Sequence, residues 1–204
     1  MIKNVVFDMG NVLVAYDENR TCRQFMEEGT EEYDRVKAAV FGSQEWVLLD
    51  MGVISEEEGL RRMKNRLRRE REKELAEKCF LHWHEFCMWT VEGAEQVIRD
   101  LKAKGYGIYL CSNASVRLRT CYREYIPAVD CFDGILFSAE EKLLKPQKEI
   151  YQRLFEKFGL KPEECFFVDD QPVNIQGAAD CGMKGCCHEK VDGETLRKEL
   201  EFLL

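Results

Sequence analysis

The sequence contains little proline, no long uncharged hydrophobic run and no Cys-x-x-Cys pair. Only 4 of its 204 residues are proline and 45% are hydrophobic, which excludes a collagen-like or disordered chain. The longest stretch without Asp, Glu, Lys or Arg covers residues 105–116, well short of the roughly 20 apolar residues of a membrane-spanning helix. Asp8 interrupts the apolar N-terminal run before the core of a signal peptide could form. We therefore expect a cytoplasmic protein with no membrane segment.

Basic residues are in the minority as well. The chain has 30 Lys and Arg against 38 Asp and Glu, which gives a net charge of −8 with neutral histidines. An acidic surface repels phosphate backbones and anionic lipids, so we expect neither nucleic acid nor a membrane as a partner.

The ten cysteines could indicate a disulfide framework, but the chain is not small and shows no secretion signal, so we expect reduced thiols. Cys181, Cys186, Cys187 and His188 also suggest a zinc site. Their spacing matches no common zinc-ligand pattern. We therefore favour buried cysteines that pack as small hydrophobic residues.

Short apolar runs alternate with helical segments in the first and last parts of the chain. The runs are brief, β-branched or aromatic, and followed by loop residues, as buried strands are. They cover residues 2–7, 108–111, 135–137, 165–168 and 185–187. Helices are predicted at residues 92–104, before Gly105, and at residues 146–158, before Gly159. This alternation predicts an α/β fold with a doubly wound, Rossmann-like parallel sheet.

Residues 17–89 interrupt the alternation with a charge-rich segment that has a helical pattern throughout. Ser55 and Glu58 form a capping-box sequence at the start of one helix. The basic run at residues 61–71 could bind a polyanion, but acidic residues flank it at helical spacing, so we favour a solvated face of paired charges. We predict an inserted helical domain at residues 17–89 on an α/β core of residues 1–16 and 90–204.

Polar residues follow four of the predicted strands. Ligands bind beyond the carboxyl ends of the strands in an open parallel sheet, so these residues should meet in one crevice. Carboxylates hold Mg²⁺, while lysine and short hydrogen-bond donors hold phosphate oxygens. The four segments begin with Asp8, Ser112, Lys145 and Asp169.

Four motifs occur in a fixed order along the chain. Residues 5–13 read VVFDMGNVL, residues 110–113 read LCSN, residues 145–146 read KP and residues 167–175 read FVDDQPVNI. Together they resemble the motifs of the haloacid dehalogenase (HAD) superfamily, and the insertion resembles its helical type-one cap. The Asp-x-Gly-Asn opening and the Asp-Asp pair are similar to the α-D-glucose-1-phosphate phosphatase-like branch.

The resemblance implies a role for each motif. Asp8 would be the nucleophile that forms an aspartyl-phosphate, which water then hydrolyses. Mg²⁺ would be held by Asp8, Asp170 and the main-chain carbonyl of Gly10, with Asp169 in support. The remaining motif residues would serve the phosphate: Ser112 and Asn113 would bind phosphoryl oxygens, Lys145 would offset charge on the phosphate and on Asp8, and Asn174 would orient Lys145 or Ser112.

Gly10 departs from the pattern of many phosphatases of this family, which carry there a second aspartate that protonates the leaving oxygen. Loss of such general acid–base help costs roughly 10²- to 10⁴-fold in rate. A leaving group that tolerates negative charge needs the acid less, which favours a sugar 1-phosphate as substrate. Asp17 is a speculative replacement acid, although an N-cap for the following helix is the favoured interpretation.

Aromatic residues of the insertion could line a sugar site, but their helical spacing equally suits the packed interior of the insertion, which we favour. These residues are Trp46, His82, Trp83, His84 and Trp89.

The leading hypothesis is a Mg²⁺-dependent phosphatase for a small phosphorylated metabolite, with transfer to water or to a second hydroxyl left open. A metal-independent 2-haloacid dehalogenase is one alternative, disfavoured by the Asp169-Asp170 pair. A non-catalytic protein that binds a phosphometabolite is another, disfavoured by Asp8.

Overall fold

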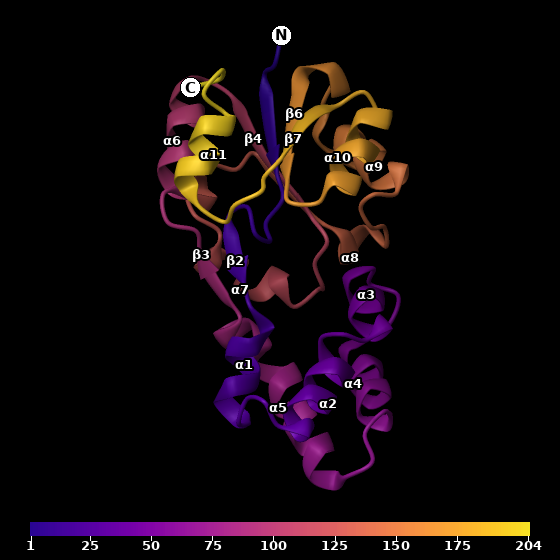
Figure 1. The fold of residues 1–204 in the computed structure, drawn as a ribbon. Coiled ribbons are helices and arrows are strands. Elements are labelled where there is room, and N and C mark those ends of the chain that lie inside the picture. Colours follow the sequence, from indigo (N-terminus) through magenta and orange to yellow (C-terminus); the bar gives the residue numbers. More distant parts are fainter.

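The computed structural model describes residues 1–204 and contains a five-stranded parallel sheet with helices on both faces and a separate group of helices beyond one end of the sheet (Figure 1). The predicted α/β fold is confirmed. In spatial order the strands are β5 (Gly134–Phe137), β4 (Gly107–Ser112), β1 (Asn4–Phe7), β6 (Cys165–Asp169) and β7 (Lys184–Cys187).

Strand β1 lies in the middle of the sheet because it is apolar on both faces. Val5, Val6 and Phe7 have no exposed surface. Phe7 pairs in parallel with Leu110 of β4 and with Val168 of β6. The residues that follow these three strands therefore come out at the same edge of the sheet, which is the physical basis of the site.

One face of the sheet is covered by α6 (Ala94–Ala103), α7 (Leu118–Tyr125) and α11 (Gly193–Glu199), whose buried side chains share a hydrophobic cluster with Phe7. The other face is covered by α9 (Lys148–Phe158) and α10 (Pro172–Asp180), which pack around Val6. Both helices predicted for these regions are present and begin slightly later than expected. Three short elements complete this part: α8 (Ser138–Glu141) and the 3₁₀ turns η1 (Val129–Cys131) and η2 (Pro162–Glu164).

Five helices at residues 18–86, called the helical unit below, have a hydrophobic cluster of their own, which includes Val36, Met63 and Phe80. The long central helix α5 contacts the other four, α3 among them through the edge-to-face rings of Trp46 and Trp83. The helices are α1 (Glu18–Phe25), α2 (Glu31–Val40), α3 (Gln44–Asp50), α4 (Glu56–Asn65) and α5 (Glu70–Phe86).

The charges of the helical unit pair with one another. The Ser55 hydroxyl accepts a hydrogen bond from the Glu58 main-chain N–H at 3.1 Å and so caps α4. The Glu58 carboxylate pairs with Arg61 and Arg62 at 2.8 and 2.6 Å, and Lys64 pairs with Glu77 at 2.6 Å. This agrees with the expected paired-charge face.

A short antiparallel pair of strands that the sequence did not predict joins the sheet to the helical unit. Strand β2 (Val14–Tyr16) leads out of the sheet and β3 (Met88–Thr90) leads back, with Ala15 opposite Trp89. In Figure 1 this pair lies between the two parts of the molecule.

All ten cysteines are free thiols. Among His, Cys, Asp and Glu, one group of three or more lies close enough to share a metal, and it is Asp8, Asp169 and Asp170. His188 is instead paired through Nδ1 with Glu199 at 2.7 Å. No helix has the length and apolar character needed to cross a membrane.

Candidate active site

Three carboxylates meet at the carboxyl ends of β1 and β6. One oxygen each from Asp8, Asp169 and Asp170 lies within 4.8 Å of the others; Asp8 and Asp169 are buried and Asp170 is partly buried. The structure thus brings together the acidic residues that the motifs predicted. Like charges this close repel one another in a buried site unless a cation lies among them.

Lys145 supplies a positive charge between two of these carboxylates. Its Nζ lies 2.8 Å from Asp8 Oδ1 and 2.6 Å from Asp169 Oδ2, and the side chain is 1% exposed. Burial by itself lowers the pKa of Lys145, but the two carboxylates outweigh it and raise the pKa above its ordinary value. The ammonium therefore stays charged, and with the three carboxylates it leaves two net negative charges.

Lys145 offsets the charge of Asp8 only in part, because it is shared with Asp169. Burial raises the pKa of Asp8 to about 6, Lys145 lowers it and the charge of Asp169 raises it. Its Oδ1 also accepts a hydrogen bond from the Met9 main-chain N–H at 2.7 Å. These contacts hold the carboxylate in one orientation at the floor of the site.

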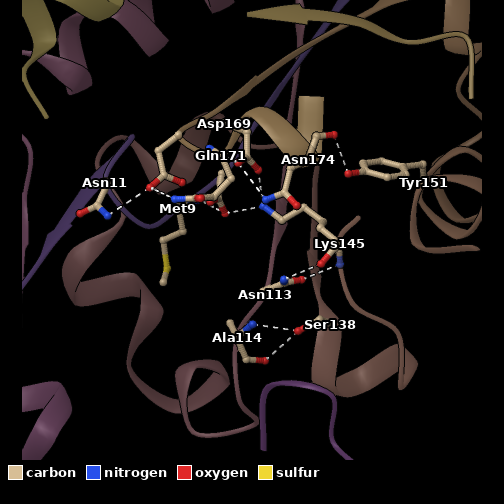
Figure 2. A network of polar contacts seen from close by, with 12 residues as sticks. Met9, Asn11, Asn113, Ala114, Ser138, Lys145, Tyr151, Asp169, Gln171 and Asn174 are labelled. Atoms are coloured by element: carbon tan, nitrogen blue, oxygen red, sulfur yellow. Dashed lines mark hydrogen bonds and ion pairs between the residues drawn. The ribbon is translucent and has the colours of Figure 1, made fainter. Parts of the chain in front are cut away.

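Asp169 is fully buried and both its oxygens are in use. Oδ1 accepts hydrogen bonds from Gln171 N at 2.8 Å and from Asn174 Nδ2 at 2.9 Å, while Oδ2 pairs with Lys145 (Figure 2). This suits the supporting role expected of Asp169. Asn174 reaches Lys145 only through Asp169, so its orienting effect is indirect.

Asn113 contacts Lys145 in a way that the sequence did not indicate. Its side-chain amide donates to the Lys145 carbonyl at 3.1 Å and accepts from the Lys145 N–H at 2.8 Å (Figure 2). These two hydrogen bonds position the Lys145 main chain. They use one of the two Nδ2 hydrogens of Asn113, so phosphate binding by this side chain stays a prediction. Ser112 is buried and lines the cavity described below.

Asp170 faces the cavity more openly. Its Oδ2 accepts hydrogen bonds from Asn11 Nδ2 at 3.2 Å and Gln171 Nε2 at 2.9 Å, so residues of the first and last motifs touch there. The donor set fits a hard divalent ion, because Mg²⁺ prefers carboxylate oxygens such as those of Asp8 and Asp170, and such an ion would balance the two net charges. Main-chain carbonyls are ligands of the same kind, and Gly10 lines the same cavity.

A cavity of about 200 Å³ opens beside these residues, between the strand ends and the helical unit. Its far wall contains Tyr16, Trp46, Asp50, Trp83 and Met88. No Lys, Arg or His is among the lining residues. The cavity is thus partly aromatic and lacks any fixed positive charge of its own.

The aromatic residues named from the sequence divide into two groups. Trp46 and Trp83 line the cavity while packing edge to face, with ring centroids 5.3 Å apart. Trp89 is 40% exposed and stacks under Arg20, away from the cavity. His82 and His84 do not line it either.

The missing general acid directs attention to two positions, Asp17 and Gly10. Asp17 is the N-cap of α1, where its Oδ1 accepts from Asn19 N at 3.0 Å and Asn19 Nδ2 at 2.8 Å, and it does not line the cavity. The N-cap interpretation is therefore the right one. At Gly10 an added Cβ would meet no atom within 4 Å, so packing does not exclude a side chain there. Asp50, which the sequence analysis missed, does line the cavity.

Comparison with known proteins gives the family. The chain matches a haloacid dehalogenase-like hydrolase family over residues 2–182. A D-ribitol-5-phosphate phosphatase from Bacteroides thetaiotaomicron is 26% identical over 211 residues, covering 100% of this chain and 99% of that protein. A sesquiterpene phosphatase from Aspergillus oryzae is 33% identical over 93 residues, and there the chain spans only 45% of the relative.

Solved structures share the fold. A HAD family enzyme from Bacteroides thetaiotaomicron, crystallised as an Asp-to-Ala variant with magnesium and inorganic phosphate, has a TM-score of 0.71 at 23% identity and covers 93% of this chain and 95% of that one. An L-2-haloacid dehalogenase from Xanthobacter autotrophicus has a TM-score of 0.67 at 19% identity, covering 99% and 83%. The fold alone does not separate the two chemistries. With the family match extending over most of the sequence and the motifs gathered at one sheet edge, the chain belongs to the haloacid dehalogenase-like hydrolase family.

Proposed function

We propose that this protein is a Mg²⁺-dependent phosphatase that hydrolyses a small phosphorylated metabolite with a neutral leaving group, most simply a sugar or polyol phosphate. One observation carries the proposal: Asp8 lies in a buried site where three carboxylates and one ammonium leave two net negative charges. That charge suits Mg²⁺, which when bound would let a phosphate dianion approach the Asp8 carboxylate.

In this mechanism the Asp8 carboxylate attacks phosphorus and becomes an aspartyl-phosphate, which water then hydrolyses. Lys145, held at 2.8 Å from Asp8, offsets charge on the transferring group. Ser112 donates to a phosphoryl oxygen. Bound Mg²⁺, held by Asp8, Asp170 and the Gly10 carbonyl, would act as a Lewis acid toward the phosphate.

The cavity supports a small neutral leaving group. Its volume of about 200 Å³ suits a metabolite rather than a macromolecule, and it lacks a Lys, Arg or His to pair with a second anionic group. We propose that residues 17–89 act as the cap whose aromatic residues Trp46 and Trp83 contact the alcohol part. The relative named as a D-ribitol-5-phosphate phosphatase is compatible with this class.

Sugar 1-phosphates are the members of this class whose leaving oxygen needs least protonation. They are the expected substrates if Gly10 leaves the site without a proton donor. A second donor in the cavity would extend the range to primary alkyl phosphates.

The 2-haloacid alternative is less well supported, because the lining offers no cation to pair with the carboxylate of such a substrate. The binding-protein alternative is also weaker. A protein that only bound phosphate would gain nothing from an Asp8 carboxylate aimed at it.

A phosphate-release screen tests the proposal. We expect turnover of sugar or polyol phosphates with Mg²⁺, none with EDTA, and loss of all turnover in Asp8→Asn. Asp17→Asn is the matched control, because it makes the same chemical change at an N-cap outside the cavity. Halide release from a 2-haloacid in EDTA, or no turnover of any ester with Mg²⁺, would contradict the proposal.

A further inference from the structure

Asp50 is held at the cavity by a hydrogen bond between the helical unit and α8, the short helix that follows β5. It is the last residue of α3, and its main-chain carbonyl accepts a hydrogen bond from the Ser138 hydroxyl of α8. The same hydroxyl oxygen accepts from the Ala114 N–H at 2.8 Å (Figure 2). Ala114 follows Ser112 and Asn113, so this connection ties Asp50 to the loop that lines the cavity beyond β4.

Gly52, two residues after Asp50, allows the chain to approach α8 closely. Gly52 has φ +69°, and a Cβ at this position would lie 2.1 Å from the carbonyl oxygen of Ala139. Only glycine allows the two backbones to come so close. The end of α3 is therefore pressed against α8 at Ser138 and Ala139, and its last side chain is placed by backbone contacts rather than by a flexible loop.

The Asp50 carboxyl has few partners in this position. It lines the cavity, a hydrogen bond with the main chain of Ser115 lowers its pKa, and no cationic group pairs with it. Burial outweighs the hydrogen bond and raises the pKa of Asp50 to about 7. A carboxyl with this environment is available as an acid near neutral pH.

The other ionisable groups of the lining are less suited to donate a proton. Asp8 and Asp170 belong to the carboxylate cluster and are needed there as anions. Burial raises the pKa of Tyr16 well above 10, which makes its phenol a weak acid.

We propose that Asp50 is the proton donor to the leaving oxygen, the part that the family usually assigns to the position occupied here by Gly10. This inference rests on the proposed phosphatase function. The acid comes from the helical unit, so it is in place only when that unit is docked on the sheet. The substrates then include alkyl phosphates and not only sugar 1-phosphates.

The two steps balance. As the Asp8 carboxylate bonds to phosphorus, the bond between phosphorus and the leaving oxygen breaks, and that oxygen takes the proton of Asp50 and departs as a neutral alcohol. The Asp50 carboxylate then takes a proton from water while the water oxygen bonds to phosphorus. The bond from phosphorus to Asp8 breaks, inorganic phosphate leaves, and both carboxyl groups return to their starting states.

The test compares two leaving groups in the full-length, Mg²⁺-loaded protein. The probes are D-ribitol 5-phosphate, within a panel of polyol phosphates, and 4-nitrophenyl phosphate. Nitrophenolate leaves without a proton, whereas a primary alkoxide does not. We expect Asp50→Asn to lower kcat/KM roughly 10²- to 10⁴-fold for the polyol ester and less than about tenfold for the aryl ester. The unchanged aryl reaction also reports that the variant is folded.

Two further variants sharpen the result. Adding Gly10→Asp to Asp50→Asn should restore much of the activity toward the polyol ester. Position 10, two residues after the nucleophile, has room for a side chain and would then carry a carboxyl group. Asp17→Asn should affect neither ester. An equal loss for both esters in Asp50→Asn would assign Asp50 a structural role and overturn the inference. So would an unmutated protein that cleaves only the aryl ester. If the unmutated protein releases phosphate from neither ester, the proposed function itself fails.

Discussion

Replacing the acid of the helical unit should make the protein more stable while making it less active. The perturbation is Asp50→Asn, which keeps the shape of the side chain and removes its charge. Burial raises the pKa of Asp50 from 3.8 to about 7. Folding therefore favours the protonated form, and the stability associated with it is present below pH 4 and lost as the pH rises through 7.

The magnitude follows from that difference. At about 1.4 kcal/mol per pKa unit, the charged carboxylate destabilises the folded protein by at most about 4 kcal/mol at pH 8. Asp50 keeps some solvent contact, so screening reduces the effect to about 2 kcal/mol. Two titratable groups neighbour Asp50. Tyr16 on β2 stays neutral at pH 5 and pH 8, because burial raises its pKa well above 10, and Glu56 on α4 pairs with Arg117 at 2.6 Å in both proteins.

The assay is urea unfolding of both proteins in EDTA at pH 5 and pH 8. We expect Asp50→Asn to be the more stable protein at pH 8, with its advantage shrinking by more than about 1 kcal/mol at pH 5. A variant no more stable than the unmutated protein at pH 8, or an advantage independent of pH, would refute the claim that this carboxyl is destabilised by burial.

Three further perturbations have definite expected outcomes. Lys145→Ala should lower the free energy of unfolding by about 3 to 5 kcal/mol, measured by denaturant titration without Mg²⁺, because Asp8 and Asp169 lose their buried counterion; an effect below 1 kcal/mol would contradict the buried pairing. Mg²⁺ at about 100 times its Kd should stabilise the protein by about 2.7 kcal/mol in thermal melts, and Asp170→Asn should lose most of this gain if Asp170 is a ligand. Gly52→Ala should reduce turnover of polyol phosphates and lower the melting temperature, since its Cβ would collide with Ala139; unchanged values for both would show that the close approach at Ala139 is not needed.

The acidic cluster could be predicted from the sequence because its cause is local and repeated. Asp8 and Asp169 each follow a run of apolar residues that can only be a buried strand, and parallel strands end at one edge. The parallel register then fixes their proximity. Phe7 lies opposite Val168, so the next residues of the two strands, Asp8 and Asp169, lie side by side. No contact between distant side chains had to be guessed.

The contact between Asn113 and Lys145 could not be predicted in the same way. Its sequence context indicates a donor at a strand end, and a phosphate oxygen is one partner for such a donor. The loop that ends at Lys145 reaches back to it, however, and the Lys145 main chain takes both ends of the amide. The path of that loop depends on how α8 and α9 pack, which strand periodicity does not encode.

The order of residues along the chain is enough to show which groups can perform the chemistry. The motifs place the carboxylates and the lysine after predicted strands, and they put a glycine, without a side chain, at position 10. The surroundings of these groups follow only from how the chain packs. The docking of α3 through Gly52 and Ser138 brings Asp50 to the cavity, and packing leaves the cavity wall without Lys, Arg or His. These features arise from contacts between segments far apart in the chain, whose distances only packing fixes.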